Sequence, residues 1–448
     1  MDLDQGLGAL AFSIAKRLKE HKHEAYFAGG CVRDDLMKVP PEDIDIATAA
    51  VPDEVEKIFP KTVAVGKQFG VMLVVEGGRP FEVATFRTEG DYHDGRHPSS
   101  VSFSIPEKDA RRRDFTINGL FYDPFHRQVI DFVGGTQDIQ NKIVRAIGDP
   151  QKRFQEDKLR LLRALRFASS LGFQIDPETW KAIQESASQI RQVSPERIRG
   201  EVVKILTRPG AGKGLELLSA SGLLKEILPE IEAMKGVAQP PKFHPEGDVF
   251  IHTRMLLEKL SHPSPVLALG ALFHDVGKPR TFAVRKDRIT FYEHAPLGAQ
   301  MTREIMRRLR FSNDEIDAVS ELVANHMKFA DVQKMRSGKL KQFVSRPTFD
   351  EELRLHKIDC LSSHGLLDNY HFLEKKMKEF EHEELRPRPL VNGHDLISLG
   401  MKPGPAMKPL LEELYEMQLE GTLKDREAAL EYAASKMKRL RQAPGREN

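Results

Sequence analysis

Apolar residues in the N-terminal part of the chain follow two different spacings. Residues 7–20 place them at helical intervals, which predicts an amphipathic helix. Short apolar runs at 24–28, 71–75, 81–86 and 129–133 lie next to glycine pairs or polar turns, which is typical of strands. This mixture predicts an α+β domain in which helices cover a mixed sheet.

The pattern changes near Pro150, after which strand signals fade and helical periodicity dominates. The Pro240-Pro241 pair and the Arg-Pro-Arg-Pro-Leu segment at 386–390 are typical of domain boundaries. We therefore expect the remainder of the chain to be mostly α-helical. The expected segments are 1–150, 151–240, 241–385 and 386–448.

Composition narrows the class of protein. The 448 residues are 40% hydrophobic and 30% charged, which excludes a disordered chain. The net charge of +2 excludes a uniformly basic surface but is compatible with a local basic groove. The two cysteines, Cys31 and Cys360, cannot form a disulfide framework or a thiolate zinc site. Because the chain has no long apolar run and no signal-like N-terminus, we expect a cytoplasmic protein that crosses no membrane.

The Gly29-Gly30 pair directly follows the first predicted strand. Glycine lets backbone amides approach a phosphate closely, and a helix that begins here favours the negative charge. Arg33 follows one turn later, within reach of the same phosphate. For the glycine pair alone, a plain connection between a strand and a helix is the alternative.

Two carboxylates, Asp43 and Asp45, follow the glycine pair. On a strand, residues two positions apart share a face, so we expect these side chains to point the same way. Such a pair repels itself unless a hard cation such as Mg²⁺ lies between the oxygens. An exposed acidic edge strand is the alternative. Glu82, on a neighbouring predicted strand, is a candidate third carboxylate.

Positive charge is concentrated in two further places. The run 111–113 is all arginine and leads through Asp114 towards Asn118, which suits a clamp for a triphosphate. Further on, Asp157 precedes arginines at every third position. We expect Asp157 and Arg160 to share one helix face, where they offer an acceptor and donors to the edge of a base. An ordinary helix salt bridge is the alternative.

These motifs, in this order, resemble the class II nucleotidyltransferases, the group that contains the tRNA CCA-adding enzymes and the bacterial poly(A) polymerases. The resemblance covers residues 20–230 densely and resumes at the C-terminus. It rests on Gly29-Gly30-x-Val32-Arg33-Asp34, Asp43-x-Asp45, Arg112-Arg113-Asp114-Phe115-Thr116-x-Asn118, Asp131-x-x-Gly134-Gly135-x-x-Asp138 and Glu156-Asp157-x-x-Arg160-x-x-Arg163-Ala164-x-Arg166-Phe167.

The resemblance implies a nucleotidyltransferase head followed by a helical neck and body. It implies an enzyme that adds CCA to the 3′ end of tRNA from CTP and ATP, without a template, by two-metal transfer on Mg²⁺ held by the catalytic Asp43 and Asp45. The nucleotide-binding residues that it implies are Gly30, Arg33, Arg113, Asp114, Asn118, Asp157, Arg160, Arg163 and Arg166. An A-adding-only enzyme, a poly(A) polymerase and an RNA-binding HD protein with an inactive transferase head remain as alternatives.

A second set of candidate ligands lies past Pro240-Pro241. His274-Asp275 follows an apolar run, and His252 and Asp359 complete a series that resembles the HD phosphohydrolase superfamily. Imidazole and carboxylate ligands suit Ni²⁺, Co²⁺ or Mn²⁺. The resemblance implies a metal-dependent phosphohydrolase domain at 241–385 that cleaves phosphate esters such as 2′,3′-cyclic phosphates. A domain that keeps the ligands without the activity is the alternative.

His294 and His326 lie where two-metal members of that superfamily carry extra ligands, so a second metal in the HD domain is a further alternative. Residues 87–98 resemble the flexible loop of family members that add the terminal A, with His97 where an arginine is frequent. The segment 391–405 resembles the tail of Bacillus-type CCA-adding enzymes, and we expect 386–448 to bind tRNA. Its basic end contains Lys436, Lys438, Arg439 and Arg441.

Overall fold

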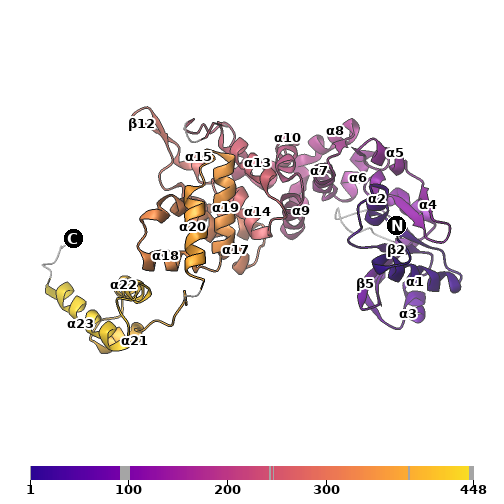
Figure 1. Ribbon diagram of the computed structural model, residues 1–448. Coiled ribbons are helices and arrows are strands. Elements are labelled where there is room, and N and C mark those ends of the chain that lie inside the picture. The colour runs from indigo at the N-terminus through magenta and orange to yellow at the C-terminus, as the bar shows by residue number, and fades with distance from the viewer. Residues whose placement is uncertain (1, 91–100, 242–243, 246, 382–383, 443–448) are drawn as a thin grey trace. The chain divides into compact units, whose positions relative to one another are not determined.

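The computed structural model describes residues 2–90, 101–241, 244–245, 247–381 and 384–442 (Figure 1). The chain forms two compact units, and each contains several stretches of sequence. The N-terminal unit comprises Met1–Lys235, Thr253–Ala268 and Ile305–Ser312, and the C-terminal unit comprises Gly236–His252, Leu269–Glu304 and Asn313–Asn448.

A seven-stranded mixed sheet forms the centre of the N-terminal unit, with the strand order β3-β4-β5-β2-β1-β8-β9. Only β2 and β5 run parallel, and the other neighbours run antiparallel. The strands are β1 (Ala25–Ala28), β2 (Asp45–Thr48), β3 (Thr62–Gly66), β4 (Val71–Glu76), β5 (Arg79–Thr85), β8 (Leu120–Asp123) and β9 (Gln128–Asp131). The four strands expected from the sequence are confirmed as β1, β4, β5 and β9.

Helix α1 (Gly6–Glu20) confirms the first predicted helix and lies against β1, β2 and β4. It buries Ile14 and Leu18 completely. A second apolar cluster on the sheet joins two aromatic rings, Phe86 and Phe121, to the small side chain of Ala47. Burying a side chain of this size stabilises the fold by roughly 1.5–3 kcal/mol. The sheet is thereby a rigid base for the residues at the ends of its strands.

Two of the helices that follow the sheet, α6 and α8, begin with proline after a capping aspartate. The carboxylates of Asp149 and Asp176 accept backbone hydrogen bonds in the first turns of α6 and α8, and a proline follows each cap. The helices that follow the sheet complete most of the N-terminal unit. They are α6 (Pro150–Glu156), α7 (Arg160–Leu171), α8 (Pro177–Ser186), α9 (Pro195–Thr207), α10 (Ala211–Ala220), α11 (Leu223–Ile227) and α12 (Pro229–Glu232).

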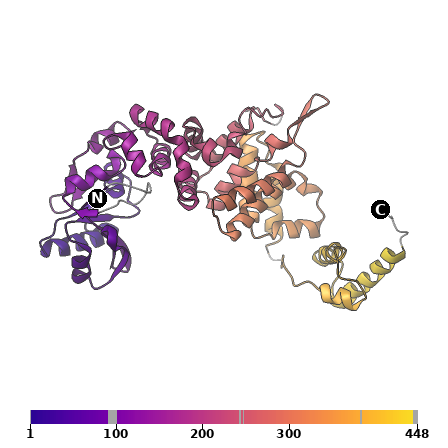
Figure 2. The same ribbon diagram turned by 180° about the vertical axis from the view of Figure 1, so that it is seen from behind.

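The C-terminal unit is mostly helical (Figure 2). Phe329, Phe343 and Phe349 form the centre of one apolar core, and Leu396, Leu410 and other residues form a separate core among the last three helices. The helices that position the features below are α13 (Val249–Lys259), α14 (Pro265–Phe273), α16 (His294–Arg308), α17 (Asn313–Asn325), α19 (Phe349–Ser362), α20 (Asp368–Glu379), α21 (Gly393–Ser398), α22 (Met407–Leu419) and α23 (Arg426–Gln442), with the 3₁₀ segment η4 (His326–Lys334).

The predicted fold class, an α+β head followed by a mostly helical remainder, is confirmed. The core of the predicted flexible loop, including His97, lies outside the described residues. Its flanks pair as β6 (Arg87–Glu89) and β7 (Val101–Phe103). Within the described ranges, none of the helices combines the length and the apolar character needed to cross a bilayer.

Candidate active sites

Three of the carboxylates that line one cleft of the N-terminal unit come from β2, the residues just before it and β5. The cavity volume of this cleft is about 510 Å³. Asp45 is the first residue of β2, and the next residue, Ile46, pairs with Val83 of β5. Asp45 and Glu82 therefore come at the same level on neighbouring parallel strands. Asp43 also lines the cleft, but it precedes β2. The prediction that Asp43 and Asp45 share a strand face is wrong in this detail, because the strand begins only at Asp45.

The electrostatic environment of Asp45 fits a divalent cation. Burial, followed by the negative charges of Glu82 and Asp43, raises the pKa of Asp45 to about 7, and Arg113 opposes this shift. In the described part of the chain, these carboxylates do not form a group of three ligand atoms close enough to hold an ion unaided. Mg²⁺ commonly binds one or two carboxylates and takes its other ligands from substrate phosphates and water.

The glycine turn predicted from the sequence lies beside this cleft. Gly29 has φ 76°, in the left-handed region that favours glycine, and it leads from β1 into α2 (Gly30–Leu36). A Cβ atom at Gly29 would lie 3.1 Å from Nη1 of Arg113. Glycine is therefore needed both for the backbone angle and for the close approach of the arginine.

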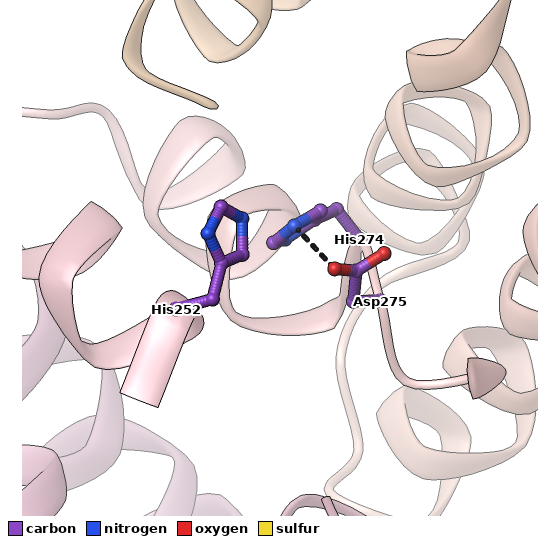
Figure 3. A group of neighbouring side chains, drawn as sticks. All are labelled: His252, His274 and Asp275. Atoms are coloured by element: carbon purple, nitrogen blue, oxygen red, sulfur yellow. Dashed lines mark ion pairs between the residues drawn. The ribbon is translucent and has the colours of Figure 1, made fainter. Parts of the chain in front are cut away.

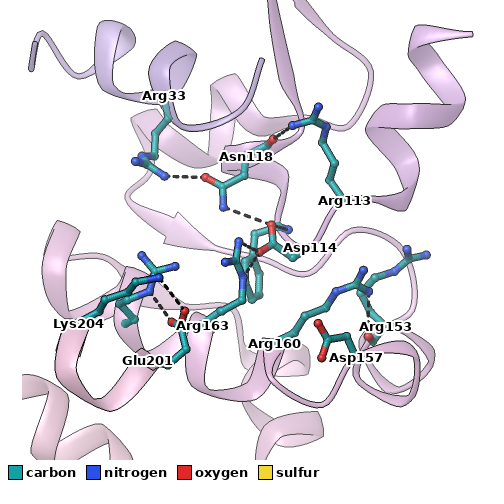
Figure 4. Close-up of polar contacts among 12 residues, drawn as sticks. Arg33, Arg113, Asp114, Asn118, Arg153, Asp157, Arg160, Arg163, Glu201 and Lys204 are labelled. Atoms are coloured by element: carbon teal, nitrogen blue, oxygen red, sulfur yellow. Dashed lines mark hydrogen bonds and ion pairs between the residues drawn. The ribbon is translucent and has the colours of Figure 1, made fainter. Parts of the chain in front are cut away.

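Four predicted nucleotide-binding residues form one hydrogen-bonded chain (Figure 4). Nη1 of Arg33 donates to Oδ1 of Asn118 at 2.6 Å, and Nδ2 of Asn118 donates to Oδ1 of Asp114 at 3.3 Å. Nε of Arg163 donates to the other oxygen of Asp114 at 2.7 Å. The network thus joins α2, the segment before β8 and α7, and it holds two guanidinium groups at the cleft.

Asp114 is the buried acceptor of that network. Burial alone raises the pKa of Asp114, but the positive charges of Arg163 and Arg160 and the hydrogen bonds outweigh it and lower the pKa to about 2. Arg113 is held separately, because its Nε and Nη2 donate to Asp109 at 3.2 and 3.1 Å. Asp109 is only 1% exposed, so this second carboxylate fixes the arginine from inside the domain.

The structure corrects the prediction for Asp157 and Arg160. They do not lie on one helix, because α6 ends at Glu156 and α7 begins at Arg160. Arg160 donates to Glu156 at 2.6 Å. Asp157 instead accepts a hydrogen bond from Nη2 of Arg197, on α9, at 2.8 Å. Both predicted base-reading residues nevertheless line the cleft.

Arg166 also lines the cleft, but its charge is already paired. Its Nε donates to Oε2 of Glu201 at 2.6 Å, and both residues are almost completely buried. Its guanidinium lies 4.1 Å from the ring centre of Phe167, beside which the guanidinium groups of Arg33 and Arg163 also lie. The ring of Phe167 therefore contacts three guanidinium groups and helps to orient them.

Further arginines that the sequence reasoning missed line the same cleft, and among the residues that the structure describes nine arginines and five carboxylates surround it. Arg197 and Arg208 come from α9 and the residue after it. Both arginines lie in a sequence that is typical of an ordinary solvent-exposed helix. The only sign of a binding role was that basic residues outnumber acidic residues in this stretch. The missed arginines are Arg197 and Arg208, whereas Arg112 belongs to the predicted clamp at 111–113 and Arg87 to the predicted loop at 87–98.

A second cluster lies in the C-terminal unit, where all six predicted HD ligands are found. His252, His274 and Asp275 converge from α13 and the end of α14 (Figure 3). One ligand atom from each of them lies within 4.8 Å of the others, and the same holds for Asp275, His294 and His326. Asp275 belongs to both groups, so its two oxygens can serve neighbouring ions.

Asp359 of α19 joins this cluster through His252. Oδ1 of Asp359 lies 3.0 Å from Nε2 of His252. Burial raises the pKa of Asp359, but the hydrogen bond and charge of His252 outweigh it, and the net shift is downward. Asp275 is similarly kept ionised, because the positive charges of His274 and Lys278 outweigh its burial and hold its pKa well below the ordinary value.

The histidines are oriented by backbone carbonyls. Nδ1 of His274 lies 2.8 Å from the oxygen of Ala271, and Nδ1 of His326 lies 2.6 Å from the oxygen of Val323. His294 makes the equivalent contact with Phe291 at 2.7 Å. This arrangement leaves each Nε2 facing the cluster, as in metal sites whose outer partners fix the imidazole tautomer.

Two observations fit a metal in this cluster. Nε2 of His274 and Oδ2 of Asp275 are buried 3.1 Å apart without hydrogen-bond geometry. Burial, followed by the charge of His274, lowers the pKa of His326 to about 3, so this imidazole is neutral at ordinary pH. Neutral imidazole with ionised carboxylate is the donor set that divalent transition metals prefer.

Comparison with known proteins assigns three regions of the chain to families. Residues 25–145 match the Poly A polymerase head domain, residues 172–235 match the probable RNA and SrmB-binding site of polymerase A, and residues 248–363 match the HD domain. A CCA-adding enzyme of Geobacillus stearothermophilus is 32% identical over 93% of this chain and 93% of its own length. One from Streptococcus gordonii is 33% identical over 95% of this chain and 97% of its own length. The chain belongs to the CCA-adding enzyme family.

Solved structures of CCA-adding enzymes share the fold. The crystal structure of the Bacillus stearothermophilus CCA-adding enzyme in complex with CTP has a TM-score of 0.76 and 27% identity, over 98% of this chain and 100% of that one. The Thermotoga maritima CCA-adding enzyme complexed with tRNA has a TM-score of 0.57 at 20% identity, over 97% and 96%. The expected class of enzyme, a tRNA nucleotidyltransferase of the CCA-adding family with an HD domain, is confirmed. The four-segment division and the individual residue roles remain predictions.

Proposed function

We propose that the N-terminal cleft adds cytidine, cytidine and adenosine to the 3′ end of tRNA, with CTP and ATP as the nucleotide donors. The observation that carries this proposal is the arrangement of nine arginines around the carboxylates of one cleft. A triphosphate and an RNA end both need such positive charge. The names of the relatives, which include complexes with CTP and with tRNA, support the same substrates.

Asp43 and Asp45 are the residues that would hold Mg²⁺, and Glu82 lies close enough in register to serve as a third carboxylate. When bound, two such ions favour ionisation of the attacking 3′-hydroxyl and neutralise charge on the pyrophosphate leaving group. The protein's own contribution is to hold the triphosphate. Arg33 and Arg163 are fixed for this by Asn118 and Asp114, so little reorganisation accompanies nucleotide binding.

Asp157 and Arg160 are proposed to select the base. Together they offer an acceptor and several donors, which match the edges of cytosine and adenine. A wrong base leaves one of these groups unpaired in the cleft, which costs roughly 1–3 kcal/mol. Arg163 and Arg166, which follow on α7, complete the wall beside the base.

The decisive experiment uses tRNA ending before the first C, after one C and after CC. Each is incubated with CTP, with ATP and with both, and the products are sized. Full CCA addition to all three supports the proposal. Addition of A to the CC end alone would indicate the A-adding-only alternative, and long A tails would indicate a poly(A) polymerase. Asp45→Asn should abolish all addition, whereas Asp53→Asn, on the surface helix α3 (Pro52–Ile58), should leave it intact.

We propose further that the HD cluster is a phosphohydrolase site for esters such as 2′,3′-cyclic nucleotides, with Ni²⁺, Co²⁺ or Mn²⁺ held by His252, His274, Asp275 and Asp359. Support comes from the shared position of Asp275 between two three-ligand groups, which leaves room for a second metal at His294 and His326. The double variant His274→Ala/Asp275→Ala should lose hydrolysis and metal while CCA addition continues. Asp45→Asn should have the reverse effect. Wild-type protein that binds metal but hydrolyses none of these esters would support the inactive-domain alternative.

A further inference from the structure

A two-stranded hairpin of the C-terminal unit concentrates charge at its tip. Strands β12 (Ala283–Arg285) and β13 (Arg288–Thr290) form a separate sheet of two strands, and Figure 1 shows the hairpin, labelled β12, extending away from the helices around it. Isolated two-stranded hairpins are only marginally stable in water. The side chains at the tip therefore contribute little to an apolar core.

Several local features of this tip oppose folding. Arg285 and Arg288 are directly opposite each other in the register, and facing like charges destabilise a strand pair. The turn between them is Lys286-Asp287, with φ angles of 48° and 60°. A turn with two positive φ angles favours glycine, asparagine or aspartate, so lysine is a costly choice. These four residues are all exposed, and three of them are cations. A bound anion would relieve the repulsion.

Aromatic rings accompany this charge at the base of the hairpin. Tyr292 is 66% exposed and Phe282 is 42% exposed, although large apolar side chains are usually covered. The guanidinium of Arg285 lies 5.2 Å from the ring centre of Tyr292, and the Phe282 and Phe291 rings are 5.9 Å apart. Exposed rings interleaved with arginines are the combination that binds single-stranded nucleic acid, through base stacking and phosphate contacts.

The hairpin is connected directly to the metal cluster. The oxygen of Phe291, which follows β13, lies 2.7 Å from Nδ1 of His294, one of the six predicted ligands. The ring of Phe291 also lies 5.3 Å from Nζ of Lys278, which in turn lies 2.7 Å from Oδ2 of Asp275. A nucleic-acid strand bound along the hairpin would therefore lie close to the candidate metal ligands through Phe291.

We propose that the β12–β13 hairpin, with Phe282 and Tyr292, is a binding surface for single-stranded RNA that presents the phosphorylated end of the strand to the HD cluster. The proposal that the hairpin binds RNA rests only on the charges and aromatic rings of the hairpin described above. The presentation step rests on the phosphohydrolase function proposed above. Duplex RNA is a poor fit, because its bases are stacked on one another and unavailable to the aromatic rings.

The test uses the full-length protein and a short single-stranded RNA that carries a 3′-phosphate and a 4-thiouridine near that end. Ultraviolet crosslinking followed by mass spectrometry should recover crosslinks within 282–292. The variants are Arg285→Glu/Arg288→Glu and Tyr292→Ala. The matched control is Lys375→Glu/Lys378→Glu, the same change of charge on exposed residues of α20.

Both hairpin variants should lose these crosslinks, and they should lower kcat/KM for the 3′-phosphorylated RNA about tenfold while hydrolysis of a mononucleoside 2′,3′-cyclic phosphate is unchanged. The control should change neither. An unmodified duplex should compete poorly with the single strand. Crosslinks that persist in both variants, or that fall equally in the control, would overturn the proposal. If the wild type hydrolyses neither substrate, the phosphohydrolase proposal fails, and the crosslinks alone decide whether the hairpin binds RNA.

Discussion

Nη2 of Arg197 donates a hydrogen bond to Oδ2 of Asp157 at 2.8 Å, which ties helix α9 to the connection between α6 and α7. Asp157 also accepts a bond from the backbone amide of Leu159, through its other oxygen. Its carboxylate is therefore fixed by two partners before any base arrives. This makes Arg197 a positioning residue for the proposed base selection.

Arg197→Ala should loosen the choice of nucleotide. Without the guanidinium, the Asp157 carboxylate can rotate, and we expect UTP incorporation to rise relative to CTP by about tenfold, equivalent to roughly 1.4 kcal/mol. The measurement is kcat/KM for each nucleotide on tRNA that ends before the first C. Arg199→Ala, on the same helix but bonded to the carbonyl of Arg310, is the control. A uniform loss of activity for all nucleotides would argue against a role in selection.

Gly29→Ala should impair catalysis through the close approach of Arg113. The added Cβ atom would lie 3.1 Å from Nη1 of that arginine, on a backbone with φ 76°. Gly78→Ala provides a matched control, because its φ is 79° and nothing lies within 4 Å of the added atom. Both variants should lose stability because of their positive φ, but only the first should raise KM for CTP. Equal kinetic effects would show that backbone strain alone is responsible.

Removing the buried ion pair between Arg166 and Glu201 should lower the free energy of unfolding much more than removing an exposed ion pair. Its side chains are 6% and 4% exposed, so Glu201→Ala leaves an unpaired buried cation and should cost about 3–5 kcal/mol. Glu216→Ala breaks the ion pairs with Lys213 and Arg254, in which Glu216 is 40% exposed, and should cost under about 1 kcal/mol. The single tryptophan, Trp180, lies on α8 of the N-terminal unit, so its fluorescence during urea unfolding reports on this unit. A small effect of Glu201→Ala would mean that water reaches the site.

Acid should remove the stabilisation that Asp114 provides. Its pKa of about 2 in the folded protein lies below the ordinary 3.8, so its contribution is fully present above pH 3.8 and is lost as pH falls towards 2. The difference corresponds to roughly 2 kcal/mol. Asp114→Asn should therefore differ most from the wild type at pH 5, and the gap should shrink as pH falls and close only below pH 2. A gap that is independent of pH would assign the effect to packing.

The structure brings the residues predicted for each site together, but the sequence did not reveal every bond between them or every arginine of the cleft. The glycine pair, Asp45 and Asn118 could be recognised because backbone angle and metal chemistry restrict those positions to few residue types. The break between α6 and α7 could not be predicted, since residues 156–160 contain no glycine or proline. At the break, Asp157 is bonded to Arg197, a partner far along the chain.

The β12–β13 hairpin was also missed. Its turn, Lys286-Asp287, lacks the glycine that usually marks a two-residue turn, and the alternation of its short strands is weak. Local propensity fails most readily where the chain is not selected for stability alone. In the HD cluster, by contrast, the series of His252, His274-Asp275 and Asp359 resembles a known superfamily, and the structure brings these candidate ligands together.

The carbonyl contacts of His274, His294 and His326 have a consequence for how this enzyme exchanges its ions. Each imidazole is held by the carbonyl of a residue three positions earlier in the chain. The cage is therefore held by local backbone contacts, and the apo protein should keep it intact, unlike small zinc domains that unfold without metal. In the proposed metal site, one ion can then replace another while the protein stays folded.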